Sequence, residues 1–273
     1  MSQREPHHGT TVSSAQADTA AQVAQWLAQA RHVCVVTGAG MSAESGIPTF
    51  RGTDDSLWSR FDPQQLATAE AWRADSELVW GWYRWRMAGV QRAQPNAGHC
   101  ALAALAARHG SVALVTQNVD DLHERASSTV AAHVHGNLFA LRCFDCGHPH
   151  DAPLAPCAPD STPLRLAPPV CGHCGGQVRP GVVWFGEALP ADAWHAAVQA
   201  ASDCELMLVV GTSGLVHPAA GLPALARRHG ARVVEINPAP TALAPSVDWA
   251  WRATAATALP ALLACLEGSV PDP

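Results

Sequence analysis

Two strand-like runs in this chain end in side chains that could act together on one ligand. The apolar run 112–115 is followed by Gln117, Asn118 and Asp120, and a second short run is followed directly by His135. The carboxyl ends of parallel strands meet at one edge of a sheet, so amides, a carboxylate and an imidazole would converge there. An imidazole titrates near neutrality, which suits a general base. Taken alone, the same residues could be turn and cap residues, since Asn and Asp favour turns.

A glycine-bearing segment follows another strand-like run, residues 33–36. It reads Thr37-Gly38-Ala39-Gly40-Met41-Ser42-Ala43, a G-x-G-x-x-A pattern between a strand and an expected helix. The glycines allow close approach of a pyrophosphate, and Ala43 is small enough for helix–strand packing. An ordinary dinucleotide fingerprint places an acidic residue about 20 residues on, whereas residues 44–52 read as a loop. The ribose contact is therefore expected from a later strand, residues 232–236, which ends at Asn237.

Four of the nine cysteines form two C-x-x-C pairs, separated by 24 residues rich in Pro and Ala. They are Cys143, Cys146, Cys171 and Cys174. This spacing predicts a tetrahedral zinc held by four thiolates in a reducing compartment. Since the protein would fill all four coordination positions, the zinc is expected to be structural rather than catalytic. Other possible ligands nearby are His148, His150, Cys157 and His173.

The chain's only tyrosine lies in a tryptophan-rich stretch, residues 56–90, that reads as a helix-rich insertion. Tyr83 and Arg86 are three residues apart, so on a helix they share one face. A phenol and a guanidinium together would form a hydrogen-bonding, positively charged socket for a carboxylate. The alternative is an ordinary amphipathic helix with a surface arginine.

Two further segments could contribute to binding. The run 180–187 contains Val182, Val183 and Phe185, and an exposed run of this kind can pair with an added peptide strand. The alternative is an internal strand. The buried-strand run 206–210 ends in Gly211-Thr212-Ser213, small hydrogen-bonding residues suited to a phosphate or ribose.

These residues are carried by a pattern of alternating strands and helices. Helical periodicity is expected over 20–30, 100–108, 221–229 and 255–267, between the strand-like runs already named. Such alternation predicts an α/β fold with a Rossmann-like, doubly wound parallel sheet, joined to a smaller zinc-binding and helical domain.

Composition excludes several classes of protein. The chain has 273 residues, 48% hydrophobic and 15% charged, with a net charge of −6 and no lysine among its 17 basic residues. This balance argues against a nucleic-acid grip, which needs clustered Lys and Arg. No apolar run is long enough to span a membrane, and the N-terminus lacks the apolar core of a secretory signal. We therefore expect a cytoplasmic protein with neither a nucleic-acid nor a membrane partner.

Taken as a set, the motifs resemble those of the sirtuins. The matching stretches are Gly38–Arg51, Thr116–Asp120, His135-Gly136, the two C-x-x-C pairs, Val182–Glu187, Gly211–Ser213 and Glu235–Asn237. They occur in order over most of the chain. The resemblance implies an NAD-dependent protein-lysine deacylase that releases nicotinamide and O-acyl-ADP-ribose and acts on acylated-lysine protein substrates.

The resemblance also implies a role for each residue. His135 would be the catalytic base, and Gln117, Asn118 and Asp120 would contact the nicotinamide ribose and the nicotinamide. The rest of the NAD site would be Gly38, Ala39, Gly40, Ser42, Ala43, Thr49, Phe50, Arg51, Gly211, Thr212, Ser213, Asn237 and Ala255. Tyr83 and Arg86 match the Tyr-x-x-Arg pair of the class III, or desuccinylase-like, branch, which binds the distal carboxylate of succinyl- or malonyl-lysine. Val182, Val183 and Phe185 would contact the substrate.

The resulting domain prediction is a disordered tail over 1–19, one sirtuin catalytic region over 20–268, and a short tail over 269–273. Within that region, 20–50, 93–140 and 182–268 would form the NAD-binding domain, 51–92 a helical insertion and 141–181 the zinc module. A monomer is expected. Two other functions stay open: protein mono-ADP-ribosyl transfer in the same pocket, and a non-catalytic zinc- and nucleotide-binding module. A hydride-transferring dehydrogenase is disfavoured by the misplaced acidic residue.

Overall fold

A six-stranded parallel sheet forms the larger of two lobes in the computed structural model, which describes residues 14–49, 62–154 and 165–268. The strand order is β3-β2-β1-β6-β7-β8. The bounds are β1 Val33–Thr37, β2 Val112–Thr116, β3 Val130–His133, β6 Leu206–Val210, β7 Arg232–Ile236 and β8 Trp249–Trp251. The predicted doubly wound α/β fold is confirmed.

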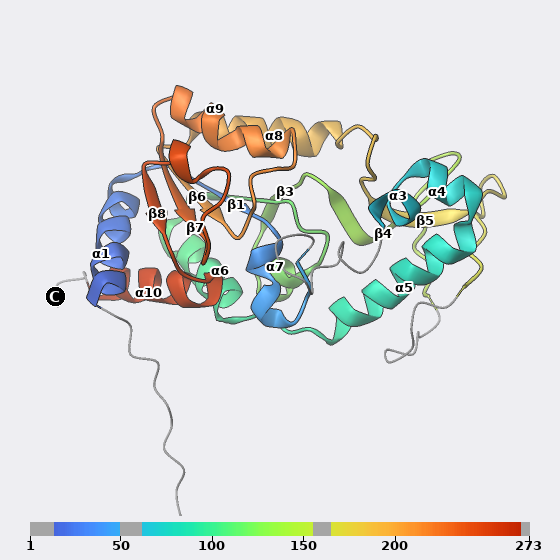
Figure 1. The fold of residues 1–273 in the computed structure, drawn as a ribbon, viewed down its shortest axis with the longest axis horizontal. Coiled ribbons are helices and arrows are strands. Elements are labelled where there is room, and N and C mark those ends of the chain that lie inside the picture. The colour runs from blue at the N-terminus through green and yellow to red at the C-terminus, as the bar shows by residue number, and fades with distance from the viewer. Residues whose placement is uncertain (1–13, 50–61, 155–164, 269–273) are drawn as a thin grey trace, which may run out of the picture.

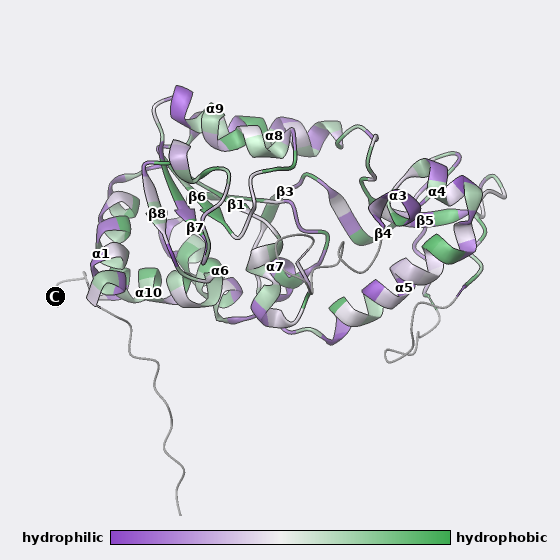
Figure 2. Cartoon of the chain, viewed as in Figure 1, coloured by the Kyte–Doolittle hydropathy of each residue, from purple (hydrophilic) through white to green (hydrophobic). Residues whose placement is uncertain are grey.

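Helices cover both faces of this sheet (Figure 1). One face packs against α1 Ser14–Gln29, α6 Ala97–His109 and α10 Ala255–Glu267, and the other against α8 Ala191–Asp203 and α9 Leu222–Arg228. Side chains alternate along a strand, so Val33 and Val35 enter one core while Cys34 and Val36 enter the other. Figure 2 shows the hydrophobic colouring along the central strands, as expected of strands buried on both faces.

The smaller lobe combines helices with a two-stranded antiparallel ribbon. It contains α3 Pro63–Leu66, α4 Ala69–Ala74, α5 Ser76–Arg92, β4 Gly136–Cys143 and β5 Val178–Val182. The hydroxyl of Thr68 caps α4 and the carboxylate of Asp75 caps α5, each accepting a backbone N–H. A buried cluster that includes Trp72, Trp80, Trp82 and Trp184 fills the space between the helices and the ribbon.

Some predicted boundaries were wrong. The first helix begins at Ser14, so residues 14–19 belong to α1 and not to a tail. The helix expected directly after Ala43 is absent from this described stretch, where two 3-10 turns occur instead, Ala39–Met41 and Ala43–Ser45. Within the described residues, no helix is long and apolar enough to cross a membrane.

Candidate functional site

The loop after β1 and the loop after β6 touch at the point where the strand order reverses. Gly40 N–H donates to the carbonyl of Gly211 over 2.8 Å, and Gly38 N–H donates to Val210 O over 2.9 Å. A Cβ on Gly40 would lie 2.7 Å from Gly211 Cα, so only glycine fits this crossing. In open α/β sheets, this reversal point is where ligands enter the crevice at the carboxyl ends of the strands.

A buried polar network joins the β1 loop to the β2 loop. The hydroxyl of Ser42 donates to Asp120 Oδ2 over 3.0 Å and accepts from Asn118 Nδ2 over 3.2 Å. Asp120 Oδ1 accepts the backbone N–H of Leu122 over 3.2 Å. Burial raises the pKa of Asp120, and the bonds from Leu122 and Ser42 offset part of that rise. The predicted Asn118 and Asp120 therefore do lie together, in fixed orientations.

His135 stands just beyond β3, next to the same loop. Its Nδ1–H donates to the backbone carbonyl of Gln117 over 3.1 Å, which leaves Nε2 as the unprotonated nitrogen of the neutral ring. Burial lowers the pKa of His135, and the bond to Gln117 opposes that shift. The imidazole is therefore neutral at physiological pH and can accept a proton on Nε2.

The β6 and β7 loops complete the opposite side of the crevice. Gln117 Nε2 donates to Thr212 Oγ1 over 3.1 Å, and Asn237 Nδ2 donates to Thr212 O over 3.1 Å. Thr212 thus connects the two predicted halves of a dinucleotide site. Ser213 beside it is exposed and accessible to a ligand.

Three predicted cofactor positions differ from the rest. Ala43 is exposed and does not pack between a helix and a strand, which corrects the role inferred from the G-x-G-x-x-A pattern. Ala255 begins α10 with its side chain in the hydrophobic core, so only its backbone could contact a ligand. Thr49 is half-buried at the end of the described loop. Phe50 and Arg51 lie outside the described residues.

Tyr83 and Arg86 lie on α5 in the smaller lobe. Tyr83 is 2% exposed, and its hydroxyl oxygen accepts the indole N–H of Trp184 over 2.9 Å. The Arg86 guanidinium carbon lies 5.7 Å from the Tyr83 ring centroid. Burial raises the pKa of Tyr83 and lowers that of Arg86, and the charge of Asp120 acts on Arg86 in the opposite direction. The two side chains therefore share one patch, electrostatically linked to the crevice.

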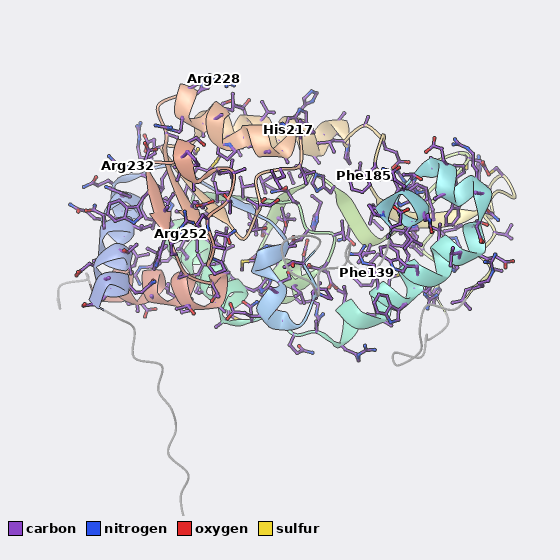
Figure 3. All side chains as sticks on the ribbon, viewed as in Figure 1. Phe139, Phe185, His217, Arg228, Arg232 and Arg252 are labelled. Carbon is purple, nitrogen blue, oxygen red and sulfur yellow. The ribbon has the colours of Figure 1, made fainter. Side chains whose placement is uncertain are left out.

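The expected substrate-binding run follows two different courses. Up to Val182, it is β5, an internal strand paired with β4, so the internal-strand alternative is correct there. Beyond it, Val183 N–H donates to His135 O over 2.8 Å and Phe185 N–H donates to Ala67 O over 2.9 Å. Phe185 is 41% exposed and lies on the connection between β5 and α8 (Figure 3). This connection brings Val183 beside the predicted base and fixes Phe185 to Ala67.

The four cysteines of the two C-x-x-C pairs form one cluster. Their sulfur atoms all lie within 4.8 Å of one another, with Cys143 Sγ 3.5 Å from Cys174 Sγ and Cys146 Sγ 3.9 Å from Cys171 Sγ. A tetrahedral zinc with Zn–S bonds of about 2.3 Å separates its sulfurs by about 3.8 Å. Backbone N–H groups also point at Cys171 Sγ and Cys174 Sγ, as expected for thiolates. The residues therefore fit a structural zinc.

Comparison with known proteins agrees with this geometry. The family model described as "Sir2 family" matches residues 38–218. This chain belongs to the Sir2 family. An "NAD-dependent protein deacylase" of Methylococcus capsulatus is 52% identical over 247 residues, covering 90% of this chain and 96% of the relative. One of the same name from Mycobacterium tuberculosis is 50% identical over 231 residues, covering 85% and 96%.

Solved Sir2 structures superpose on the whole fold. A Sir2 homologue–NAD complex has a TM-score of 0.81 at 40% identity and covers 97% of each chain. An ADP-ribose complex of a mutant Sir2 homologue has a TM-score of 0.83 at 42% identity, covering 91% of this chain and 96% of that one. The sirtuin resemblance drawn from the motifs is thereby confirmed.

Sequence reasoning missed a pair of imidazoles behind this Sir2 crevice. His99 and His123 are buried, with ring centroids 4.9 Å apart. His123 Nε2 lies 3.0 Å from the hydroxyl of Thr37, which donates to Thr116 Oγ1, and the N–H of Asn118 donates to the same oxygen. The pair is therefore linked to the backbone of Asn118 through Thr37 and Thr116. The Asn96-x-x-His99 spacing marks the start of α6, but nothing in the sequence indicates its contact with His123.

Proposed function

We propose that this chain is an NAD-dependent protein-lysine deacylase. The observation that carries the proposal is the convergence of Asn118, Asp120 and His135 beside the glycine crossing, at the reversal point of a parallel sheet. The curated relatives carry the same activity in their names, and a matching structure was solved with NAD. Bound NAD would supply an activated ribose carbon with nicotinamide as its leaving group, the acyl group would pass from lysine to a ribose hydroxyl, and one water would be consumed in releasing the free lysine.

The chain's own residues would bind and orient this cosubstrate. Gly38 and Gly40 hold the β1 loop against the β6 loop, and the backbone of the β1 loop would face the pyrophosphate. Thr212 and Asn237, which are hydrogen-bonded to each other, would contact the adenosine side, and Asp120 and Asn118, both bonded to Ser42, would contact the nicotinamide ribose. We assign the remaining predicted NAD residues, Ala39, Ala43, Thr49, Phe50, Arg51, Gln117, Gly211, Ser213 and Ala255, to the margins of the same site.

His135 would act as the general base. Its Nδ1–H is fixed by the Gln117 carbonyl, so Nε2 is the nitrogen that can take a proton from a ribose hydroxyl. A neutral imidazole matches this task near physiological pH. The protonated ring would release its proton to water when the product leaves.

We further propose that the enzyme prefers acyl groups with a distal carboxylate, such as succinyl or malonyl. Arg86, which is half-buried, supplies a positive charge beside the hydroxyl of the buried Tyr83. The Trp184 N–H occupies an acceptor site of the Tyr83 oxygen, so the phenol hydrogen is available to a carboxylate. An acetyl group has no carboxylate to bind these two donors, so it gains nothing from the patch.

The other predicted features enter as parts of the same proposal. The four thiolates would hold a structural zinc, and Val182, Val183 and Phe185 would line the path of a protein substrate. We retain the domain bounds predicted above, apart from the earlier start of α1, and a monomer. A cytoplasmic location is supported by the thiolate cluster, which requires reduced cysteines.

Mass spectrometry of one lysine peptide in acetylated, succinylated and unmodified form, each with protein and NAD, tests this function. NAD-dependent removal of succinyl well above acetyl, with O-succinyl-ADP-ribose formed, would support both the activity and the preference. Removal of acetyl alone would keep the deacylase and discard the socket. Transfer of ADP-ribose to protein without acyl loss would favour the transferase alternative, and unconsumed NAD would favour the binding module.

A further inference from the structure

The hydrogen bond between Trp184 and Tyr83 has a fixed direction. An indole N–H can only donate, so the phenol oxygen must accept, and the two atoms are 2.9 Å apart. Trp184 is 1% exposed and Tyr83 is 2% exposed, so water does not compete for this bond. Since the indole fills one side of the phenol oxygen, the phenol hydrogen is left to point to the other. No residue in the described part of the chain accepts it.

Trp184 is itself held in place from several directions. Its backbone N–H donates to Glu187 Oε2 over 2.8 Å, and its carbonyl accepts Glu187 N–H over 3.0 Å. The Arg179 guanidinium carbon lies 3.2 Å from its ring centroid, and Arg179 is paired with Glu187 through two hydrogen bonds. Arg179 is only 4% exposed. A buried cation stacked on the indole and tied to the same carboxylate restricts the ring to one orientation.

The Tyr83 hydroxyl that this indole orients lies beside a positive charge. Arg86 shares its helix face, and the phenol, whose ordinary pKa is about 10, is protonated at neutral pH. A carboxylate entering this patch meets a guanidinium and a hydroxyl whose hydrogen is already directed away from the indole. Preorganised donors of this kind bind an anion without the cost of reorienting.

We propose that Trp184 is a positioning residue, which directs the Tyr83 hydroxyl and thereby sets the preference for acyl-lysines that carry a distal carboxylate. This rests on the proposed deacylase function and adds a third residue to the Tyr83–Arg86 socket. An acetyl group has no atom that reaches the hydroxyl, so its removal does not depend on the direction of that hydrogen.

The chain offers a matched pair of variants. Trp184→Phe keeps an aromatic ring for Arg179 but removes the N–H donor. Trp72→Phe makes the same change 5.6 Å away in the same aromatic cluster, where the Trp72 N–H has no hydrogen-bond partner within the described residues. For Trp184→Phe we expect the ratio of succinyl to acetyl kcat/KM to fall by about tenfold, mainly through the succinyl KM, the effect of roughly one hydrogen bond to a charged group. For Trp72→Phe, the ratio should stay within about twofold.

A double-variant cycle separates positioning from packing. Tyr83→Phe removes the hydroxyl, so adding Trp184→Phe to it should lower the ratio no further. Equal loss of succinyl and acetyl activity in Trp184→Phe would overturn the proposal, as would an unchanged ratio or a full additional loss in the double variant.

Because Tyr83 is the only tyrosine in the chain, the wild-type protein gives a second readout that needs no variant. A ¹³C label at the tyrosine Cζ gives one NMR signal that reports hydrogen bonding of this hydroxyl. A succinyl-lysine peptide should shift this signal and the Trp184 indole N–H signal together, and an acetyl-lysine peptide should shift neither. Identical responses to the two peptides would overturn the proposal even if Trp184→Phe failed to fold. If the wild-type protein removed neither acyl group from these peptides, the deacylase function itself would be refuted.

Discussion

Replacing Gly40 by alanine tests whether the crossing of the β1 and β6 loops shapes the cosubstrate site. The new Cβ would lie 2.7 Å from Gly211 Cα and 2.9 Å from Gly211 O, and both of these are backbone atoms. Gly211 cannot retreat easily, since its N–H donates to Ile236 O over 2.9 Å and its φ is +64°, in the left-handed region. The clash must therefore be relieved by a shift of the β1 loop.

The expected cost follows from this rigidity. Overpacking of a close contact costs roughly 1–3 kcal/mol. For a domain of this size, each kcal/mol lowers Tm by about 2–4 °C, so we expect Gly40→Ala to lower Tm by roughly 3–10 °C. A loop displaced by a fraction of an ångström also misplaces the backbone that would face the pyrophosphate, and the Kd for NAD should rise about tenfold or more.

Thermal unfolding and calorimetric titration with NAD measure both effects. The matched control is Gly89→Ala, because Gly89 lies within α5 and a Cβ there would meet no atom within 4 Å. Alanine at that helix position should stabilise the protein by about 0.5–1 kcal/mol and leave the Kd for NAD unchanged. If Gly40→Ala matched this control in Tm and in NAD affinity, the crossing would not be the feature that holds the site.

Three further predictions concern other parts of the molecule. His135→Ala should lower kcat by at least about 100-fold with unchanged zinc content. The acid limb of the wild-type kcat/KM profile should have its midpoint below the ordinary histidine pKa of about 6.5, since burial lowers the pKa of the base. A decline that begins above pH 7 would contradict this assignment. Cys146→Ser should abolish zinc binding and lower Tm by at least about 5 °C, the shift expected for roughly 2 kcal/mol, and metal analysis with retained zinc would refute the site. Burial lowers the pKa of His99 to about 4 and of His123 to about 3. Below the ordinary histidine pKa of about 6.5, the unfolded chain therefore binds more protons at these two residues than the folded chain does. The free energy of unfolding should fall as the pH drops from about 6.5 to 4. His99→Gln, which preserves the capping pattern at the start of α6, should flatten this dependence in urea titrations at several pH values, and an unchanged slope would argue against the buried neutral pair.

The parallel sheet could be predicted from sequence because its strands are buried on both faces. Such strands read as uninterrupted apolar runs, and the polar residues that follow each run mark the carboxyl edge. The positions of Gln117, Asn118 and Asp120 follow from this rule alone. The zinc cluster was equally predictable, since two C-x-x-C turns bring four sulfurs together whatever the structure of the segment between them.

The exposed Ala43 shows where the same reasoning fails. A G-x-G-x-x-A pattern implies a long helix after the turn, but Ser42 turns inward to bind Asp120, and the chain continues as short 3-10 turns. That outcome depends on a partner 78 residues away, which local spacing cannot reveal. The bond between Trp184 and Tyr83 spans 101 residues and was missed for the same reason.

If His135 is the base, as proposed, its placement requires the two lobes to be held together for catalysis. The base follows the last strand of one side of the sheet, and β4 of the smaller lobe begins at the next residue, Gly136. The carbonyl of His135 accepts Val183 N–H, so the connection that returns from the smaller lobe is fixed to the base itself. Trp184 comes one residue later and reaches Tyr83. A shift of the smaller lobe would therefore move the proposed acyl socket and the proposed base together. The distance between the acyl group and the proton acceptor would be kept, which links acyl selection to catalysis.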